Sequence, residues 1–212
     1  MSRYDTYIFD LDGTLLDTLG DLAASVNHAL RSFGMEERGI DFIRMSVGNG
    51  VGSLIMRSVP DGTAAETADK VIAVFKEHYT AHGQELTVPY PGIVDMLRRL
   101  KASGARTAVV SNKFDAATKR LCAHYFGGMM DVAIGESEGI RRKPAPDTVE
   151  EALRQLRASR ENAVYVGDSD VDIATARNSR LPCISVLWGF RDRAFLSAHG
   201  ASVFAESPAD IL

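Results

Sequence analysis

The apolar positions of this 212-residue chain follow two different patterns in two different regions. Between residues 16 and 86 they recur every three or four positions, as they do along one face of a helix. We therefore expect this region to be all-helical, with helices over 18–33, 42–57 and 64–81. Asp17 or Thr18 can cap the first of these helices.

A second pattern begins after the stretch Val88-Pro89-Tyr90-Pro91-Gly92. Its prolines and glycine make a stiff boundary. Beyond it, helical stretches alternate with short apolar runs, and one more such run, Thr6–Phe9, precedes the helical region. Helices that feed short strands predict right-handed crossovers and a parallel sheet buried on both faces. The expected helices are 93–102, 116–125, 148–158 and 173–178, and the expected strands are 107–110, 132–134, 163–166 and 184–187.

The N-terminal strand has no helical partner outside the region 16–86, so the simplest architecture places it in the same sheet as the later strands. We expect an α/β fold in which residues 1–15 and 88–212 form the sheet core. Residues 16–87 would then be a helical cap inserted after the first strand. No repeat or low-complexity stretch interrupts this plan.

Composition limits the classes of function. The net charge of −4 offers no excess of positive charge for binding nucleic acid. No apolar run is close to the length of about 20 residues that a helix needs to cross a bilayer. Because the segment Met1–Asp5 runs straight into the predicted first strand, we expect no signal peptide. Cys122 and Cys183 have no metal-type spacing, and we expect both to be buried thiols. Together these observations predict a protein of the reducing cytoplasm. We expect it to be a monomer or a homodimer. Surface or packing roles are expected for His28, His78, His82, His124, His199 and Trp188.

Four polar clusters follow predicted strands or the loops just beyond them. They are Asp10-Leu11-Asp12-Gly13-Thr14, Ser111-Asn112-Lys113, Lys143-Pro144-Ala145-Pro146 and Gly167-Asp168-Ser169-Asp170-Val171-Asp172. The carboxyl ends of parallel strands share one edge of a sheet, where ligands bind. Clusters that are distant in sequence are therefore expected to form one site.

The groups in these clusters suit metal-assisted phosphoryl transfer, in which the site must neutralise the charge of the phosphate. The carboxylates of Asp10 and Asp168 and the backbone carbonyl of Asp12 would hold Mg²⁺, which prefers oxygen ligands. Asp10 would attack phosphorus. Asp12 would protonate the leaving alkoxide and then accept a proton from the hydrolytic water. Lys143 would offset phosphoryl charge, and the Ser111 hydroxyl would bind phosphoryl oxygens.

Neighbouring residues have supporting roles in this hypothesis. Thr14, Asn112 and Lys113 are expected to contact the substrate. Asp172 lies one helical turn beyond the second metal ligand, and with Ser169 it is expected to orient metal-bound water or the lysine of the site.

The glycine-rich segment Gly48–Gly52 has no strand leading into it, which argues against a dinucleotide-binding loop. We expect instead a cap loop that places Gly48, Asn49 and Gly50 near the substrate, and Arg44 could also reach it. A plain turn between two helices is the alternative.

The four clusters resemble the motifs of the haloacid dehalogenase-like hydrolase superfamily. Asp10–Thr14 resembles the first motif, Ser111-Asn112 the second, Lys143 the third and Gly167–Asp172 the fourth. The resemblance implies a Rossmann-like parallel sheet core with a cap inserted after the first strand, in agreement with the periodicity.

Residues at single positions indicate which subgroup of the superfamily the chain resembles. Dehalogenases and phosphonate hydrolases of the superfamily lack an acid at the position of Asp12, and sugar phosphomutases often have Val at the position of Thr14. Further stretches, including Pro89–Gly92 and Val47–Gly52, are similar to phosphoglycolate phosphatases. The resemblance implies a Mg²⁺-dependent phosphatase for small phosphorylated metabolites that acts through an aspartyl phosphate. The alternatives are a sugar phosphomutase or pyrophosphatase of the same superfamily, a phospho-accepting signalling module, or a binding protein without catalysis.

Overall fold

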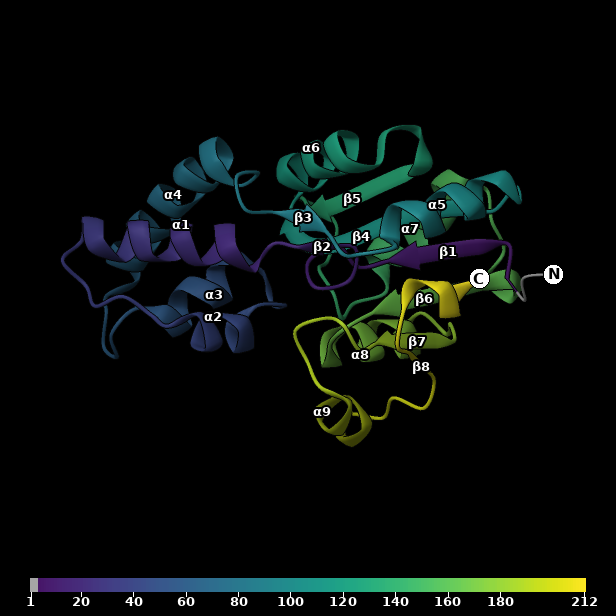
Figure 1. Ribbon diagram of the computed structural model, residues 1–212. Coiled ribbons are helices and arrows are strands. Elements are labelled where there is room, and N and C mark those ends of the chain that lie inside the picture. The colour runs from purple at the N-terminus through teal and green to yellow at the C-terminus, as the bar shows by residue number, and fades with distance from the viewer. Residues whose placement is uncertain (1–3) are drawn as a thin grey trace. The chain divides into compact units, whose positions relative to one another are not determined.

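The computed structural model describes residues 4–212 (Figure 1). The expected direct entry from Met1–Arg3 into the first strand lies outside the described residues. The chain divides into two compact units, one made of the described residues up to Leu16 together with Pro89–Leu212, the other of Asp17–Val88. Where the chain passes between the units, β2 (Leu16–Asp17) pairs with β3 (Val88–Pro89). The expectation of no strand within 16–86 was therefore wrong at its first two residues.

The first unit is built on a six-stranded sheet with the order β5-β4-β1-β6-β7-β8. Every neighbouring pair is parallel, and the central strand β1 aligns Thr6 with Arg106 on one side and with Ala163 on the other. The sheet confirms the expected Rossmann-like α/β class. Its strands are β1 (Thr6–Phe9), β4 (Arg106–Phe114), β5 (Val132–Glu136), β6 (Ala163–Gly167), β7 (Cys183–Val186) and β8 (Phe204–Ala205).

Successive residues of each strand point to opposite faces of the sheet, and on both faces these residues are apolar. Helices therefore cover both faces. Tyr7 and Phe9 join the core formed with α5 (Ile93–Ala102) and α6 (Asp115–Phe126). Ile8 joins the opposite core, formed with α7 (Asp147–Leu156) and α8 (Asp170–Asn178). The remaining helices of the unit are α9 (Arg193–Ala198), η1 (Gly127–Met129), η2 (Arg160–Asn162) and η3 (Pro208–Ile211).

Two elements of the sheet unit extend by three or more residues beyond the ranges expected from the sequence. Strand β4 does not end at Val110 but continues to Phe114, with a shift of register between the two. Helix α8 begins at Asp170 because Ser169 and Asp172 form a reciprocal capping box. In both places the polar residues that looked like a loop belong to a regular element.

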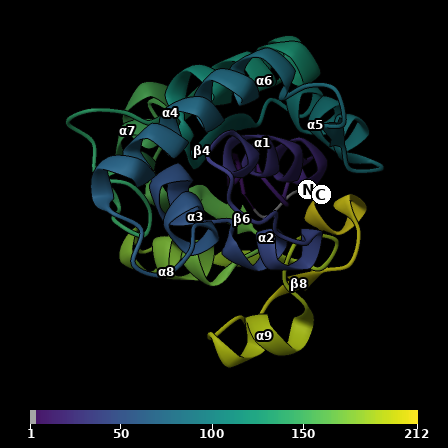
Figure 2. The same ribbon diagram turned by 90° about the vertical axis from the view of Figure 1, so that its left-hand side faces the viewer.

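The second unit contains α1 (Leu19–Ser32), α2 (Ile40–Ser46), α3 (Gly50–Ser58) and α4 (Ala65–His82). Helix α1 packs against α4 and α2, and α3 packs against α4 (Figure 2). The single helix expected over 42–57 is broken at Val47–Asn49, where Gly48 adopts a φ of 123° that favours glycine. Gly50 begins α3, so only part of the glycine-rich segment is a loop.

A buried carboxylate joins the two ends of the helical unit. Asp21 in α1 accepts hydrogen bonds from the backbone N–H of Leu86 (2.9 Å), the backbone N–H of Thr87 (2.8 Å) and the Thr87 hydroxyl (2.7 Å). At the start of α1, Asp17 accepts the N–H of Leu19, whereas Thr18 provides no side-chain cap. Of the two candidate caps, Asp17 is therefore the one that binds a free N–H of the first turn.

In the helical unit, the ring of His78 stacks on that of His28 and lies tilted against that of His82. The ring of His78 lies 4.1 Å from that of His28 and 4.5 Å from that of His82, measured between centroids. Its Nδ1 lies 2.9 Å from the Ser25 hydroxyl. Packing is the role expected for these histidines, but their mutual contact across α1 and α4 was not foreseen.

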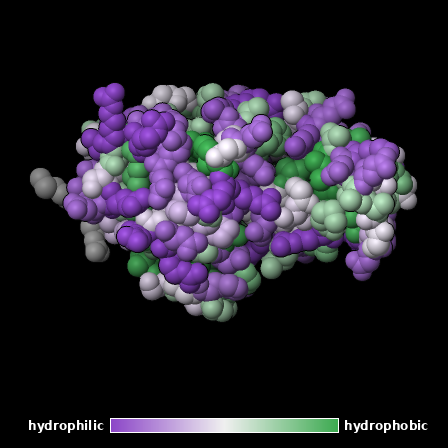
Figure 3. Space-filling view, turned by 180° about the vertical axis from the view of Figure 1, so that it is seen from behind, coloured by the Kyte–Doolittle hydropathy of each residue, from purple (hydrophilic) through white to green (hydrophobic). Residues whose placement is uncertain are grey.

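The surface seen in Figure 3 is mostly hydrophilic, with hydrophobic side chains scattered among the polar ones. Within residues 4–212, no helix combines the length and the apolar character needed to cross a membrane. Cys122 is buried, Cys183 is half-buried, and both are free thiols.

Candidate active site

The carboxyl ends of β1, β4 and β6 form the site, because these three strands are neighbours in the sheet. Asp10 follows the last residue of β1, and its N–H donates to the Val166 carbonyl at 2.9 Å. Asp168 follows Gly167 at the end of β6, and Ser111 lies in the last part of β4. Sheet order reverses at β1, which is where open α/β sheets bind ligands.

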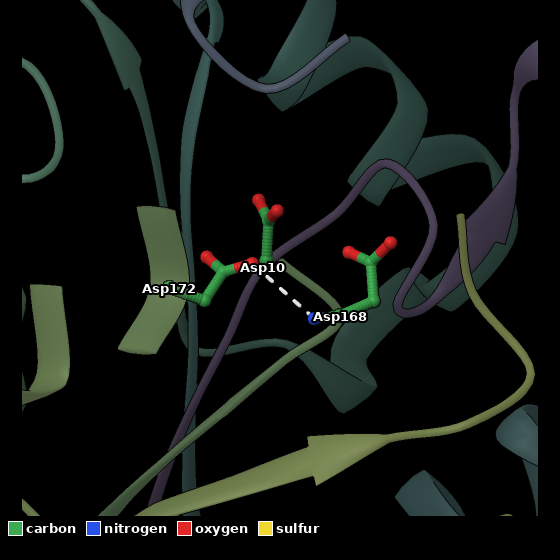
Figure 4. Close-up of side chains that lie close together, drawn as sticks. All are labelled: Asp10, Asp168 and Asp172. Atoms are coloured by element: carbon green, nitrogen blue, oxygen red, sulfur yellow. Dashed lines mark hydrogen bonds between the residues drawn. The ribbon is translucent and has the colours of Figure 1, made fainter. Parts of the chain in front are cut away.

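Three buried carboxylates gather at this edge, from Asp10, Asp168 and Asp172 (Figure 4). One oxygen atom from each lies within 4.8 Å of the others. Like charges this close in a buried place repel one another, so the cluster needs compensating positive charge.

Lys143 provides one positive charge within the cluster. Its ammonium lies 2.8 Å from Asp10 Oδ1 and 2.8 Å from Asp172 Oδ1, and it donates to the Tyr165 hydroxyl at 3.0 Å. The side chain of Lys143 is only 2% exposed. One ammonium against three carboxylates leaves an excess of negative charge when all three are ionised.

Asp172 is held by hydrogen bonds at both of its oxygens. Oδ1 accepts from Lys143 and from the Tyr165 hydroxyl at 2.9 Å. Oδ2 accepts from the Ser169 hydroxyl at 2.6 Å and from the backbone N–H groups of Ser169 and Asp168 at 3.1 and 3.2 Å. These bonds fix the position of the Asp172 carboxylate, and the role of Asp172 and Ser169 in orienting metal-bound water stays a prediction.

Asp10 is bound at one oxygen only. Oδ1 accepts from Lys143 and from the backbone N–H of Leu11 at 2.7 Å. Its Oδ2 accepts no hydrogen bond from any residue in the described range 4–212. This oxygen is left available for a metal ion or a reacting atom.

The electrostatics of the site favour binding of a cation. Burial, with repulsion from Asp172, raises the pKa of Asp10 well above its usual range and that of Asp168 to about 7. Burial opposes the charge on Lys143, but Asp10 and Asp172 outweigh it and raise the pKa of its ammonium. A bound divalent cation would reverse this effect at the carboxylates and hold them ionised.

The donor set fits a hard divalent cation. All the nearby charged ligands are carboxylate oxygens, which Mg²⁺ prefers to nitrogen or sulfur. Asp172 already accepts five hydrogen bonds, so Asp10 and Asp168 are the two carboxylates suited to bind the cation. The third expected ligand, the backbone carbonyl of Asp12, stays a prediction; the side chain of Asp12 contacts Lys113.

Asp12 and Lys113 form a second ion pair beside the cluster. The ammonium of Lys113 lies 2.9 Å from Asp12 Oδ1 and 3.0 Å from Oδ2. The Ser111 hydroxyl accepts the N–H of Lys113 at 3.2 Å, and the Asn112 amide donates to the Lys143 carbonyl at 3.0 Å. The structure thus gives Asn112 and Lys113 contacts within the site, and their binding of substrate stays a prediction.

Thr14 and the loop after β7 surround Asp168. The Thr14 hydroxyl donates to Asp168 Oδ1 at 3.2 Å, and the N–H of Phe190 donates to Oδ2 at 2.8 Å. The indole N–H of Trp188 donates to the Thr14 carbonyl at 2.9 Å. Sequence reasoning missed these contacts of Trp188 and Phe190, and it also missed Tyr165. Only the hydroxyl of Tyr165 within an otherwise apolar strand gave a signal that could have been noticed.

The other predicted substrate residues, Gly48, Asn49 and Gly50, lie in the helical unit at the start of α3. Asn49 occupies the N-cap position of that helix. Their role toward a substrate stays a prediction.

Comparisons with known proteins show the family of this chain. Residues 7–186 match the family model described as haloacid dehalogenase-like hydrolase. The chain is 33% identical over 184 residues to the phosphoglycolate phosphatase of Aquifex aeolicus, covering 86% of this chain and 84% of the relative. It is 32% identical over 207 residues to phosphoglycolate phosphatase 1 of Pseudomonas aeruginosa, covering 95% and 73%.

A solved structure is similar over the full length. This is the crystal structure of a predicted phosphoglycolate phosphatase from Lactobacillus delbrueckii subsp. bulgaricus, with a TM-score of 0.94 and 37% identity, covering 100% of this chain and 97% of that one. The chain therefore belongs to the haloacid dehalogenase-like hydrolase family. Within that family it falls in the phosphoglycolate phosphatase-like subgroup, which confirms the resemblance of the four motifs.

Proposed function

We propose that this protein is a Mg²⁺-dependent phosphatase that hydrolyses small phosphate monoesters through an aspartyl phosphate on Asp10. The observation that carries the proposal is the state of Asp10, which is held at Oδ1 while Oδ2 accepts no hydrogen bond from the described residues. A carboxylate fixed in this way beside an ammonium and a second metal-type carboxylate has the features of a nucleophile for phosphoryl transfer.

The cation would be held by Asp10 and Asp168. When bound, it would offset the negative charge of the cluster and of the phosphoryl group. Lys143 adds a fixed positive charge next to Asp10. Tyr165 and Asp172 keep that ammonium in place, so its charge needs no rearrangement during the reaction.

In the first step, Asp10 Oδ2 forms a bond to phosphorus while the ester bond to the leaving oxygen breaks. Asp12, which must carry a proton when the substrate binds, donates that proton to the leaving oxygen and becomes a carboxylate. In the second step, water attacks phosphorus, gives its proton to Asp12, and displaces Asp10 as phosphate is formed. The Ser111 hydroxyl is proposed to bind a phosphoryl oxygen through both steps.

The similarity to phosphoglycolate phosphatases favours a small phosphorylated carboxylic acid as substrate. We propose that the helical unit Asp17–Val88 acts as the cap that selects it, with Gly48, Asn49 and Gly50 in contact with the substrate. The free thiols of Cys122 and Cys183 support a reducing compartment such as the cytoplasm.

The test is phosphate release from a panel of phosphoglycolate, sugar phosphates, nucleotides and pyrophosphate, with and without Mg²⁺. We expect turnover that requires Mg²⁺ and falls by at least about 10³-fold in Asp10→Asn, because the variant lacks the nucleophile. The matched control is Asp95→Asn, which changes an exposed aspartate of α5. Full turnover in Asp10→Asn would overturn the proposal.

Product analysis separates the alternatives. A sugar phosphomutase would return the phosphoryl group to the sugar instead of releasing phosphate. A signalling module would accumulate a long-lived phosphoprotein without turnover.

A further inference from the structure

The loop between β7 and α9 forms two hydrogen bonds with the site, although none of its residues belongs to the four motifs. Its Phe190 N–H donates to Asp168 Oδ2, and its Trp188 indole donates to the Thr14 carbonyl. The loop begins just beyond residues 7–186, the part of the chain that matches the family model.

The middle residue of this loop lies against Asp168. A Cβ atom added to Gly189 would overlap the Cβ of Asp168 and the carbonyl oxygen of Gly13. A Cβ atom on Gly13 would in turn overlap the Asp168 carboxylate and crowd the Phe190 ring. The Asp168 side chain is therefore enclosed by backbone on two sides, and its rotamer has little freedom.

The hydrogen bonds leave room for a metal ion. Asp168 Oδ1 accepts one bond from Thr14 and Oδ2 accepts one bond from Phe190. Each carboxylate oxygen has two acceptor directions, so each retains one. Outer residues that fix a ligand in this way increase metal affinity because the ligand loses less freedom on binding.

We propose that the loop Trp188–Phe190 presets the Asp168 carboxylate for a divalent cation, with Trp188 and Gly189 as positioning residues. Trp188 fixes the loop to Thr14, and Gly189 permits the close approach that lets the Phe190 N–H reach Asp168. This inference rests on the proposed function, because it assigns the loop to the metal site of that function.

The test compares Mg²⁺ binding by calorimetry in the full-length chain, independently of activity. Trp188→Phe removes the indole N–H but keeps an aromatic ring. Gly189→Ala adds the overlapping methyl group, and its matched control is Gly128→Ala, where an added Cβ meets nothing within 4 Å. We expect the dissociation constant for Mg²⁺ to rise about 10- to 100-fold in Trp188→Phe and Gly189→Ala and to stay unchanged in Gly128→Ala.

Two further readouts separate positioning from general destabilisation. Excess Mg²⁺ is expected to restore the kcat of Trp188→Phe to nearly the wild-type value, with KM for the substrate unchanged. Trp188 is the only tryptophan of the chain, so its fluorescence should respond to Mg²⁺ in the wild type.

The outcomes are distinct. If the wild type binds no Mg²⁺, the proposed function and this inference both fail. If the wild type binds Mg²⁺ and Trp188→Phe binds it equally well, the proposed function stands and the loop has no positioning role. If Gly189→Ala does not fold, Trp188→Phe decides, and a lower melting temperature with unchanged Mg²⁺ affinity contradicts the inference.

Discussion

The ammonium of Lys113 contacts both carboxylate oxygens of Asp12, at 2.9 and 3.0 Å, although 101 residues separate them in sequence. Both side chains are nearly buried, with 4% and 11% exposure. A pair bound at both oxygens fixes the direction of the Asp12 carboxylate two residues after Asp10. In the proposed mechanism, Lys113 thus orients the group that carries the proton.

The first prediction concerns Lys113→Met, which removes this ion pair. We expect kcat to fall about 10- to 100-fold with little change in KM, because orientation of the proton carrier matters in the transition state. The measurement is steady-state kinetics on the best substrate of the panel. Lys119→Met, at an exposed lysine of α6, is the control. A raised KM with unchanged kcat would instead show that Lys113 binds the substrate.

The second prediction concerns Tyr165→Phe. The hydroxyl of Tyr165 donates to Asp172 and accepts from Lys143 in a fully buried place. Its loss leaves two charged groups with one hydrogen bond fewer each, so the free energy of unfolding should fall by about 2 kcal/mol. Urea denaturation followed by circular dichroism measures this change. An unchanged free energy would mean that the hydroxyl is dispensable to the network.

The third prediction concerns Asp21→Ala in the helical unit. The substitution leaves three donors of Leu86 and Thr87 without their acceptor. We expect the free energy of unfolding to fall by about 3 kcal/mol, whereas Asp41→Ala, at an exposed aspartate, should change it by less than about 0.5 kcal/mol. Asp21→Asn keeps one acceptor and should fall between the two. Equal stability of the Asp21 and Asp41 variants would contradict the prediction.

The fourth prediction concerns pH and the stacked histidines. Burial and the nearby His28 and His82 lower the pKa of His78, with Arg31 acting in the same direction and Glu85 against them. The unfolded chain therefore takes up a proton at a higher pH than folded His78 does. Its contribution to stability is complete above the ordinary pKa of about 6.5 and is lost as the pH falls below that value.

Melting temperatures at about pH 7.5 and about pH 5.5 test this prediction. The fall in melting temperature on acidification should be smaller in His78→Gln than in the wild type. His124→Gln, in the sheet unit, is the control and should behave as the wild type. Identical pH dependence of the wild type and His78→Gln would refute the prediction.

Elements with a strong and uninterrupted pattern were predicted to the residue. Strand Thr6–Phe9 and helix Ile93–Ala102 have the expected bounds, since each is set by its own side chains and by a turn at its end. Where polar residues continue a regular element, the pattern failed, as in β4 beyond Val110. Strand β8 and helix α9 were missed because they are too short for a period to show.

The candidate site likewise has one part that the sequence predicts and another that it does not. The meeting of Asp10 and Asp168 follows from the rule that parallel strands end at one edge, and this rule needs no coordinates. The partner of Lys113 and the contacts of Trp188 depend on side-chain directions and backbone donors. Such contacts have no spacing in the sequence, so only the folded chain reveals them.

The position of β1 at the centre of the sheet has a consequence for biosynthesis. Thr6 pairs with Arg106 and Ala163, partners that lie 100 and 157 residues further along the chain. The helical unit Asp17–Val88 is one continuous stretch of chain, so all of it is translated before β4 and β6. Strand β1 can take its place in the sheet only after both of these neighbouring strands have been translated. Asp10 is thus translated long before Ser111 and Asp168, the residues that the sheet later brings to the same edge.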